Sequence, residues 1–113
     1  MHRIRRGDVW RVSFDPSLGG EIRKTRPAVI LSNNPANEAL NRVVVVPLSS
    51  RVSRIYPGEA LVNVAGRQAK AMADQITAAS KLRLRERIET LQAADLKAIE
   101  NAILLHLGIR RPT

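Results

Sequence analysis

Arginine and serine are the residues whose positions in this chain could support chemistry on a phosphate. Arg26 stands directly before Pro27, and the proline ring restricts Arg26 to an extended backbone conformation. The backbone that carries its guanidinium therefore has a defined position. A guanidinium can donate two hydrogen bonds to a phosphate and stabilise charge that builds up there. Ser49 and Ser50 end a valine-rich run that is typical of a strand. Their hydroxyls would be exposed at the rim of the sheet, where they could donate a hydrogen bond to a phosphate oxygen. An ordinary surface arginine and turn-forming serines are the alternatives that these residues leave open.

Other kinds of catalytic site have little support in the sequence. The chain has no cysteine, which excludes disulfides, thiolate metal sites and cysteine nucleophiles. It shows no glycine-rich phosphate loop opening a helix, no metal-ligand cluster and no Ser-His-Asp set. Its two histidines, His2 and His106, lie near the termini, and we expect both to be structural. We therefore expect no metal and no cofactor.

The balance of charge favours a polyanionic partner. Nineteen Lys and Arg residues against ten Asp and Glu residues give a net charge of +9, and most of the excess lies in the first half of the chain. Such a balance attracts a nucleic-acid backbone, although small basic proteins that bind no nucleic acid also exist. The 113 residues are the usual length of one domain, and we expect a single domain over residues 1–113.

The N-terminus argues against export. Its basic residues are followed by Gly7-Asp8, where a signal peptide would need an apolar run. No stretch reaches the roughly 18 apolar residues that a membrane span requires. We expect a soluble, cytoplasmic protein.

Hydrophobic patterning predicts strands first and a helix last. The segment Asp8 to Phe14 alternates like a half-buried strand, and the next residues, 15–25, indicate a long mobile loop. Runs at 27–31 and 42–47 are typical of strands covered on both faces, with a single helical turn near Asn33-Asn34-Pro35 between them. Further strands are expected at 59–64 and 68–73.

The last third predicts an amphipathic helix from Gln92 to Leu107. Its apolar stripe is Leu96, Ile99, Ile103 and Leu107, and Gly108 lies just beyond its end. Short strands followed by one terminal helix indicate an α+β fold: a small, strongly bent antiparallel sheet or barrel with the helix packed against it.

Six segments occur in the order and spacing of one known family: Arg6-Gly7-Asp8-Val9-Trp10, Asp15-Pro16 with Gly19 and Glu21, Thr25-Arg26-Pro27, Val46-Pro47-Leu48-Ser49-Ser50, Asp74-Gln75-Ile76, and the terminal helix. Together they resemble the MazF/PemK toxins of bacterial toxin–antitoxin modules, over nearly the whole chain. The resemblance implies a PemK/CcdB-type barrel, related to SH3-like barrels. It also implies a homodimer that cleaves single-stranded RNA at short sequences without a metal, and a cognate antitoxin whose acidic, disordered tail occupies the RNA groove.

The resemblance also assigns roles to residues. The catalytic arginine of the family falls on Arg26 and its catalytic hydroxyl on Ser49. In MazF-like chemistry the ribose 2′-hydroxyl attacks the adjacent phosphate, which leaves a 2′,3′-cyclic phosphate and a 5′-hydroxyl. We expect Arg26 to act in proton transfer and charge stabilisation, although arginine is a poor general base. Ser49 is expected to hold the scissile phosphate.

Supporting roles are weaker expectations. Glu21 and Asp74 could orient a base or the guanidinium, and a solvated carboxylate or a structural ion pair is the alternative for each. We expect Gly20, Lys24, Arg51 and Arg54 to line the RNA groove, the basic ones by contacting backbone phosphates. A solubilising surface charge is the alternative for every basic residue.

Two departures from the family pattern bear on the chemistry. The family commonly has Thr-Ser where this chain has Ser49-Ser50, which keeps a hydroxyl but leaves its rotamer less restrained. The Kid/PemK branch carries Arg-x-Asp where this chain has Met72-Ala73-Asp74, so the acid–base assignment of that branch does not transfer whole. The alternative functions are a CcdB-like poison of DNA gyrase, which acts by protein contact, and an RNA-binding module with a defunct site.

Overall fold

A computed structural model describes residues 3–14 and 24–110 of the chain. Its elements are, in chain order, β1 (Asp8–Ser13), β2 (Thr25–Ile30), α1 (Asn34–Ala39), β3 (Arg42–Ser49), β4 (Glu59–Val64), β5 (Arg67–Met72), the short 3-10 helix η2 (Ala73–Gln75), β6 (Thr77–Ser80), a second 3-10 helix η3 (Lys81–Arg83), β7 (Leu84–Thr90) and α2 (Ala93–Leu107).

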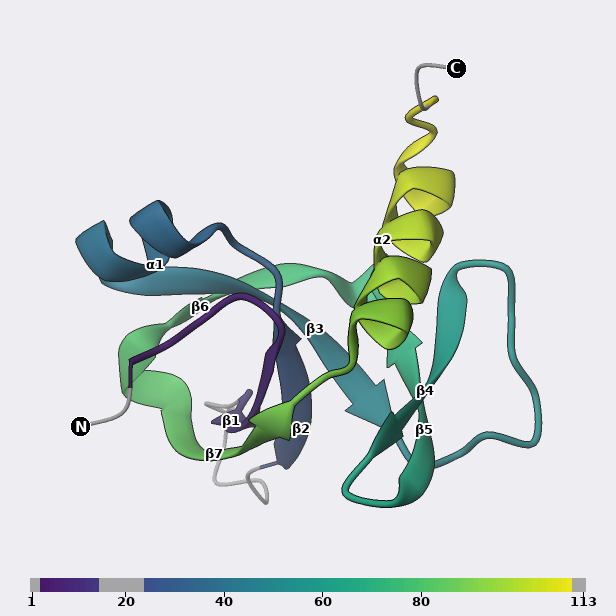
Figure 1. The fold of residues 1–113 in the computed structure, drawn as a ribbon, viewed down its shortest axis with the longest axis horizontal. Coiled ribbons are helices and arrows are strands. Elements are labelled where there is room, and N and C mark those ends of the chain that lie inside the picture. The colour runs from purple at the N-terminus through teal and green to yellow at the C-terminus, as the bar shows by residue number, and fades with distance from the viewer. Residues whose placement is uncertain (1–2, 15–23, 111–113) are drawn as a thin grey trace, which may run out of the picture.

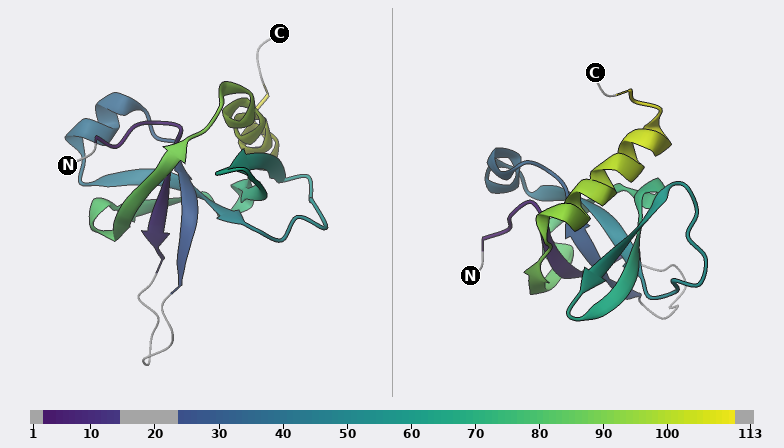
Figure 2. Two further views of the ribbon diagram at one scale, coloured as in Figure 1. Left: turned by 60° about the horizontal axis from the view of Figure 1, so that its bottom comes forward. Right: turned by 45° about the vertical axis from the view of Figure 1, so that its right-hand side comes forward.

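The strands form a curled antiparallel sheet in the order β4-β5-β3-β2-β1-β7, with β6 paired to β3 off this path. The sheet bends into a half-barrel, and α2 packs on one side of it, across the β4–β5 hairpin (Figures 1 and 2). This confirms the α+β prediction of a bent antiparallel sheet with a terminal helix.

Strand β3 holds the half-barrel together because it has partners on both of its edges. Its first half pairs with β6, its middle with β2 and its last two residues with β5. Val45 has strand partners on both sides, Ile30 in β2 and Thr77 in β6. The β5 and β6 strands thus follow one edge of β3 in succession, with η2 inserted between them.

Both predicted helices are present. Asn33 caps α1 through its side-chain oxygen, which accepts a hydrogen bond from Ala36 N at 2.8 Å, and Pro35 lies in the first turn as expected. Gly108 ends α2 in the left-handed conformation, with φ of 70°. Gln92 caps its start without a side-chain hydrogen bond. Among the described residues no helix is long and apolar enough to cross a membrane.

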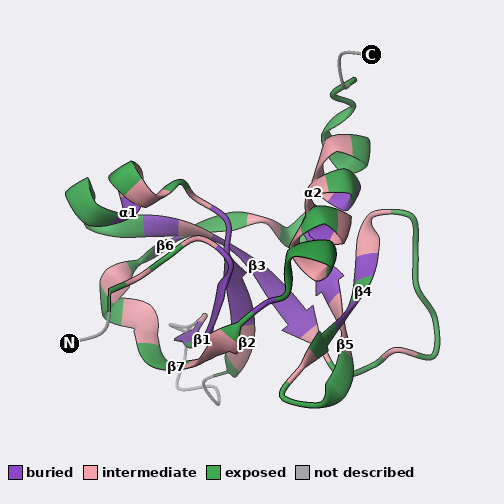
Figure 3. Ribbon diagram, viewed as in Figure 1, coloured by how far each residue is buried: buried purple, intermediate pink, exposed green. Residues whose placement is uncertain are grey.

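Two apolar clusters form the core. One lies between α2 and the sheet and includes Val9, Val29 and Ile99, which are all fully buried. The other lies in the curl of the sheet and includes Trp10, Val12 and Ile30. Figure 3 shows the buried residues running along β1, β2 and β3, which have an apolar cluster on each face. The 27–31 and 42–47 runs were therefore predicted correctly as strands covered on both faces.

Several boundaries and faces differ from the sequence predictions. The first strand is not half-buried, because α2 and its cluster cover the face that carries Val9. The loop after it ends before Thr25, where β2 begins, so Arg26 lies within a strand rather than before it. Leu107 does not extend the buried stripe of α2; it is 54% exposed because the last turns project beyond the sheet (Figure 1). Strands β6 and β7 were not predicted.

The contact between helix and sheet yields a stability prediction. Replacing Ile99 by alanine removes a fully buried side chain from α2 and leaves a cavity. We expect Ile99→Ala to lower the free energy of unfolding by about 3 kcal/mol, as measured by urea denaturation at one protein concentration. The matched change Ile109→Ala, at an exposed isoleucine beyond the helix, should change it by less than about 0.5 kcal/mol. Similar losses in both variants would mean that Ile99 does not anchor the helix.

Candidate functional site

The register between β2 and β3 brings Arg26 and Ser49 to equivalent positions. Ala28 pairs with Pro47, Val29 with Val46 and Ile30 with Val45. Continuing the same antiparallel register by two residues sets Arg26 opposite Ser49, just past the last paired residues. At this point β3 turns to pair with β5, since Leu48 pairs with Ala71 and Ser49 with Lys70.

Arg26 and Ser49 line one cavity of about 580 Å³. Its walls come from the ends of β2 and β3, the β4–β5 turn, and single residues of β1 and β7. The lining residues are Arg11, Arg26, Pro27, Leu48, Ser49, Ser50, Arg51, Val64, Ala65, Arg67, Gln68, Ala69 and Ile88. The sequence-predicted pair is therefore brought together at one end of the sheet.

The cavity is electropositive. Among the residues that the structure describes, four arginines line it, at positions 11, 26, 51 and 67, and no Asp or Glu does. Arg11 is partly neutralised, because its Nε lies 2.7 Å from Oε1 of Glu86 on the neighbouring strand. Unlike charges attract most strongly where water is partly excluded, so a cavity of this composition suits a phosphate group.

Ser49 has a hydroxyl arranged to donate. Its Oγ accepts a hydrogen bond from the backbone N–H of Arg51 at 3.2 Å. That bond occupies a lone pair of the oxygen and leaves the hydroxyl hydrogen available for another acceptor. Ser49 is half-buried at the end of β3, so the group is held by the strand and still accessible.

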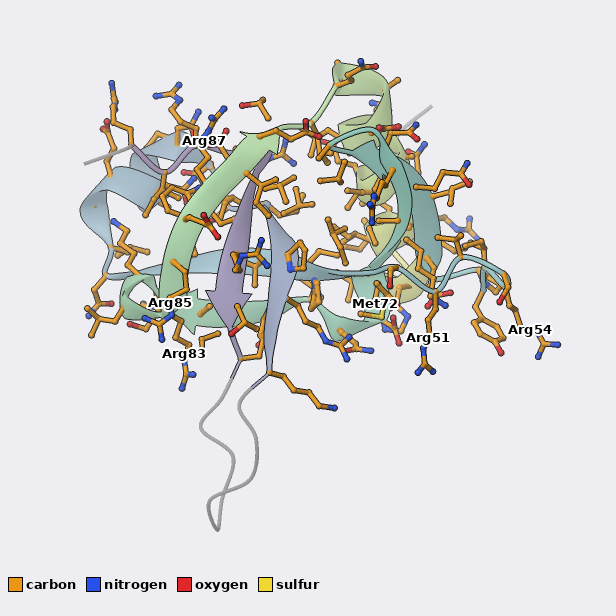
Figure 4. The ribbon with its side chains drawn as sticks, turned by 90° about the horizontal axis from the view of Figure 1, so that it is seen from below. Arg51, Arg54, Met72, Arg83, Arg85 and Arg87 are labelled. Atoms are coloured by element: carbon orange, nitrogen blue, oxygen red, sulfur yellow. The ribbon has the colours of Figure 1, made fainter. Side chains whose placement is uncertain are left out.

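The other predicted site residues are distributed more widely. Arg51 lines the cavity, whereas Arg54 lies farther along the β3–β4 loop, and Figure 4 shows both side chains pointing outward on that side of the molecule. Lys24 is exposed just before β2 and is not a lining residue. Gly20 and Glu21 lie outside the described residues.

Asp74 is not part of this cavity. It is exposed in η2, and its Cβ lies near the loop glycine Gly58, where the side chain of His106 also packs. Met72, which stands where the Kid/PemK branch has arginine, is buried at the end of β5. Within the described part of the chain, no three His, Asp or Glu side chains gather in a group that could hold a metal ion.

Sequence reasoning missed Arg11, Arg67 and Gln68 as lining residues. Each lies on a strand or at a turn far from Arg26 in sequence, and only the strand pairing carries it to the cavity. Arg11 is recognisable as the exposed polar residue of an alternating strand. The sequence carries no comparable signal for Arg67 and Gln68.

Residues 5–107 match the family model described as PemK-like, MazF-like toxin of type II toxin–antitoxin system. The chain belongs to this family. Over 115 residues it is 36% identical to a protein named endoribonuclease MazF9 from Mycobacterium tuberculosis, covering 94% of this chain and 98% of that relative. The family that the sequence resembles is thereby confirmed.

Solved structures give the same fold for this toxin. A mycobacterial endoribonuclease in complex with its cognate antitoxin is 27% identical, with a TM-score of 0.77 over 96% of this chain and 98% of that one. A MazE–MazF structure from Deinococcus radiodurans is 23% identical and superposes with a TM-score of 0.84 over 97% and 100% of the two chains. The second likeness shows the fold alone.

The β4–β5 turn of the cavity wall contains a strained residue. Val64 pairs with Arg67 across a two-residue turn whose central residues, Ala65 and Gly66, have φ of 51° and 79°. A hairpin turn of this kind favours Asn or Gly at its first position, whereas an alanine is strained there. The backbone N–H of Ala65 donates to Oε2 of Glu89 at 2.7 Å, which ties the turn to β7.

Relieving this strain should stabilise the toxin. We expect Ala65→Gly to raise the free energy of unfolding by about 1 kcal/mol, because glycine adopts positive φ without a Cβ clash. The same change at Ala78, inside β6, should instead lower it by about 0.5–1 kcal/mol through added backbone freedom. Urea denaturation of the two variants measures both signs, and destabilisation by Ala65→Gly would contradict the strain.

Proposed function

We propose that this toxin is an endoribonuclease that cleaves single-stranded RNA at short sequences and that a cognate antitoxin neutralises it. The observation that carries the proposal is the shared cavity of Arg26 and Ser49, whose described lining contains four arginines and no carboxylate. The names of two relatives support it: one is an endoribonuclease, and the other is an endoribonuclease bound to its antitoxin.

The proposed reaction uses the RNA's own hydroxyl. The ribose 2′-oxygen bonds to the adjacent phosphorus, and the bond from phosphorus to the 5′-oxygen of the next nucleotide breaks. The products are a 2′,3′-cyclic phosphate and a 5′-hydroxyl, and the proton lost by the 2′-hydroxyl balances the one gained by the departing oxygen. DNA lacks the 2′-hydroxyl, so the same site would not cleave it.

Arg26 and Ser49 have different roles at the scissile phosphate. The guanidinium of Arg26 stabilises the charge that accumulates on the phosphoryl oxygens and gives a proton to the departing 5′-oxygen, and the proton from the 2′-hydroxyl restores it. The hydroxyl of Ser49 donates to a phosphoryl oxygen and holds the scissile group in place. Arg51 and Arg67 attract the neighbouring phosphates.

The charge of the cavity also fits the proposed antitoxin. An acidic, disordered tail would meet the same arginines as the RNA backbone and would exclude the RNA from the cavity. Competition for one electropositive surface then explains neutralisation without any change in the fold of the toxin. No observation favours gyrase inhibition, and the confirmed family is the one whose resemblance implies RNA cleavage.

The proposed homodimer has a surface to form on. A second cavity, of about 670 Å³, lies between α1, β3, β6 and α2, with apolar side chains that include Leu31, Leu40, Ile76, Ile103 and Leu104. Leu40 is 41% exposed although it lines this cavity. A second copy would remove this apolar surface from water, which stabilises association.

The roles of Arg26 and Ser49 predict how RNA cleavage responds to substitution. We expect Arg26→Ala to slow cleavage of a long RNA by about a hundredfold or more, as loss of one charge-stabilising donor typically does. Ser49→Ala should cost less, and Ser49→Thr should retain activity because the hydroxyl remains. The matched control is Arg85→Ala, at an exposed arginine on β7 that does not line the cavity.

Two conditions separate this mechanism from the alternatives. Cleavage should persist in EDTA, and a single 2′-deoxy substitution at the mapped cut site should abolish it there. Equal rates for the unmodified protein and Arg26→Ala would overturn the assignment of Arg26. Failure of the unmodified protein to cut any RNA, combined with inhibition of DNA gyrase, would favour the CcdB-like alternative.

The dimer is tested by its apolar surface. Leu104→Glu places a carboxylate in the second cavity, so we expect it to convert the dimer to monomers in light scattering coupled to size-exclusion chromatography. Leu82→Glu, at a leucine that is 87% exposed in η3, should leave the mass unchanged. A monomeric mass for the unmodified protein would contradict the proposal directly.

A further inference from the structure

Tyr56 is the exposed member of the three aromatic side chains in the chain. Trp10 is 8% exposed and Phe14 is half-buried, and both pack in the cluster inside the curl of the sheet. Tyr56 is 53% exposed and lies in the loop between β3 and β4, which follows Ser49. Half of its surface thus remains in water, although burying an aromatic ring is among the strongest contributions to a core.

The backbone of Tyr56 is fixed by a reciprocal pair of hydrogen bonds. Its N–H donates to Oε1 of Glu59 at 2.9 Å, and its carbonyl accepts from the N–H of Glu59 at the same distance. Pro57 and Gly58 form the turn between the two residues. The loop therefore presents the ring from a defined backbone position.

A nearly buried lysine fixes the ring as well. The side chain of Lys70 is 12% exposed; its Nζ lies 3.2 Å from Oε1 of Glu59 and donates to the carbonyl of Arg54 at 3.1 Å. The same ammonium lies 5.6 Å from the centroid of the Tyr56 ring, within the range of a cation–π interaction. Lys70 thereby ties both the ring and the loop to β5.

This network connects the ring to the candidate site through β5. Lys70 is the strand partner of Ser49, so the residue that supports Tyr56 lies directly opposite the residue proposed to hold the scissile phosphate. The guanidinium of Arg54 lies 6.0 Å from the ring centroid and donates to the phenolic oxygen at 3.4 Å. Figure 4 shows Arg54 and Arg51 projecting on this side.

We propose that the ring of Tyr56 stacks against an unpaired base of the RNA substrate, beside the cavity of Arg26 and Ser49. A rigid, half-exposed ring next to cations combines the two contacts that bind single-stranded RNA, which are a stacking face for a base and positive charge for its phosphates. Because every base has a π-face, this contact strengthens substrate binding without selecting a base. The inference rests on the proposed ribonuclease activity and assigns a base-binding residue to the same site.

The first experiment is a kinetic comparison on an oligoribonucleotide that contains one cut site, mapped beforehand with the unmodified protein. We expect Tyr56→Leu to raise KM by about tenfold, with a much smaller change in kcat, because stacking contributes to binding. Tyr56→Phe, which retains the ring without the hydroxyl, should recover most of the loss. Leu82→Ala is the control, an exposed apolar side chain in η3 that does not line the cavity.

The second experiment locates the stacked base. We use a series of oligonucleotides that each lack one base. Removing the base at one position should raise KM for the unmodified protein but should not raise it further for Tyr56→Leu. If the increase in KM from the missing base and the increase from Tyr56→Leu were additive at every position, the stacking contact would be overturned. Failure of Tyr56→Phe to restore KM would assign the effect to the hydroxyl and would overturn it too.

Stability and binding measurements keep this test separate from the proposed function. Thermal unfolding of each variant identifies losses that come from the fold. If the unmodified protein cuts no RNA, the ribonuclease proposal fails, and fluorescence anisotropy of the same labelled oligonucleotides still measures whether Tyr56→Leu weakens binding. Equal affinity of the unmodified protein and Tyr56→Leu would overturn the stacking proposal by itself.

Discussion

The antiparallel register between β2 and β3 is the constraint on which the site depends. Val29 opposite Val46 fixes the alignment, and both side chains are fully buried. A slip of one residue would turn every side chain of one strand to the opposite face of the sheet, which burial on both faces strongly disfavours. The same register, continued outward, brings the candidate phosphate ligands Arg26 and Ser49 opposite each other. The packing of aliphatic side chains in the sheet thus determines how Arg26 and Ser49 lie relative to each other at the end of β2 and β3.

Strand β3 links this register to the rest of the molecule. Its early residues pair with β6 and its last two with β5, so its C-terminal end leaves β2 and opens the sheet where the cavity lies. The β4–β5 hairpin then contributes Arg67 and a turn that Glu89 of β7 holds through its bond to Ala65. Strands at the two ends of the sheet therefore meet at the cavity, and the curl of the sheet is what closes it.

Apolar burial and charge are located in different parts of this protein. The apolar clusters contain aliphatic side chains almost entirely, and they account for the stability of the half-barrel. Arg26, Arg51 and Arg67 lie at strand ends or in a loop, where the guanidinium groups remain hydrated until an anion arrives. Arg11 lies within β1 and is paired with Glu86. Lys70 differs, because Glu59, a backbone carbonyl and the Tyr56 ring compensate its burial. It supports the loop, whereas the cavity arginines are available to a ligand.

The sequence by itself determined the fold class and the family, and it predicted Arg26 and Ser49 as the central pair of the site. Alternating and valine-rich runs predicted β1 to β5 to within a few residues, because local periodicity reflects burial directly. It missed β6 and β7. Their residues are rich in Ala, Arg and Glu, and they form strands because β3 and β1 each have an edge with which they can pair. It named Arg26, Ser49 and Arg51 but not Arg11, Arg67 or Tyr56. Tertiary structure alone decided which of the many charged residues share a cavity, because strand pairing joins positions that no local pattern connects.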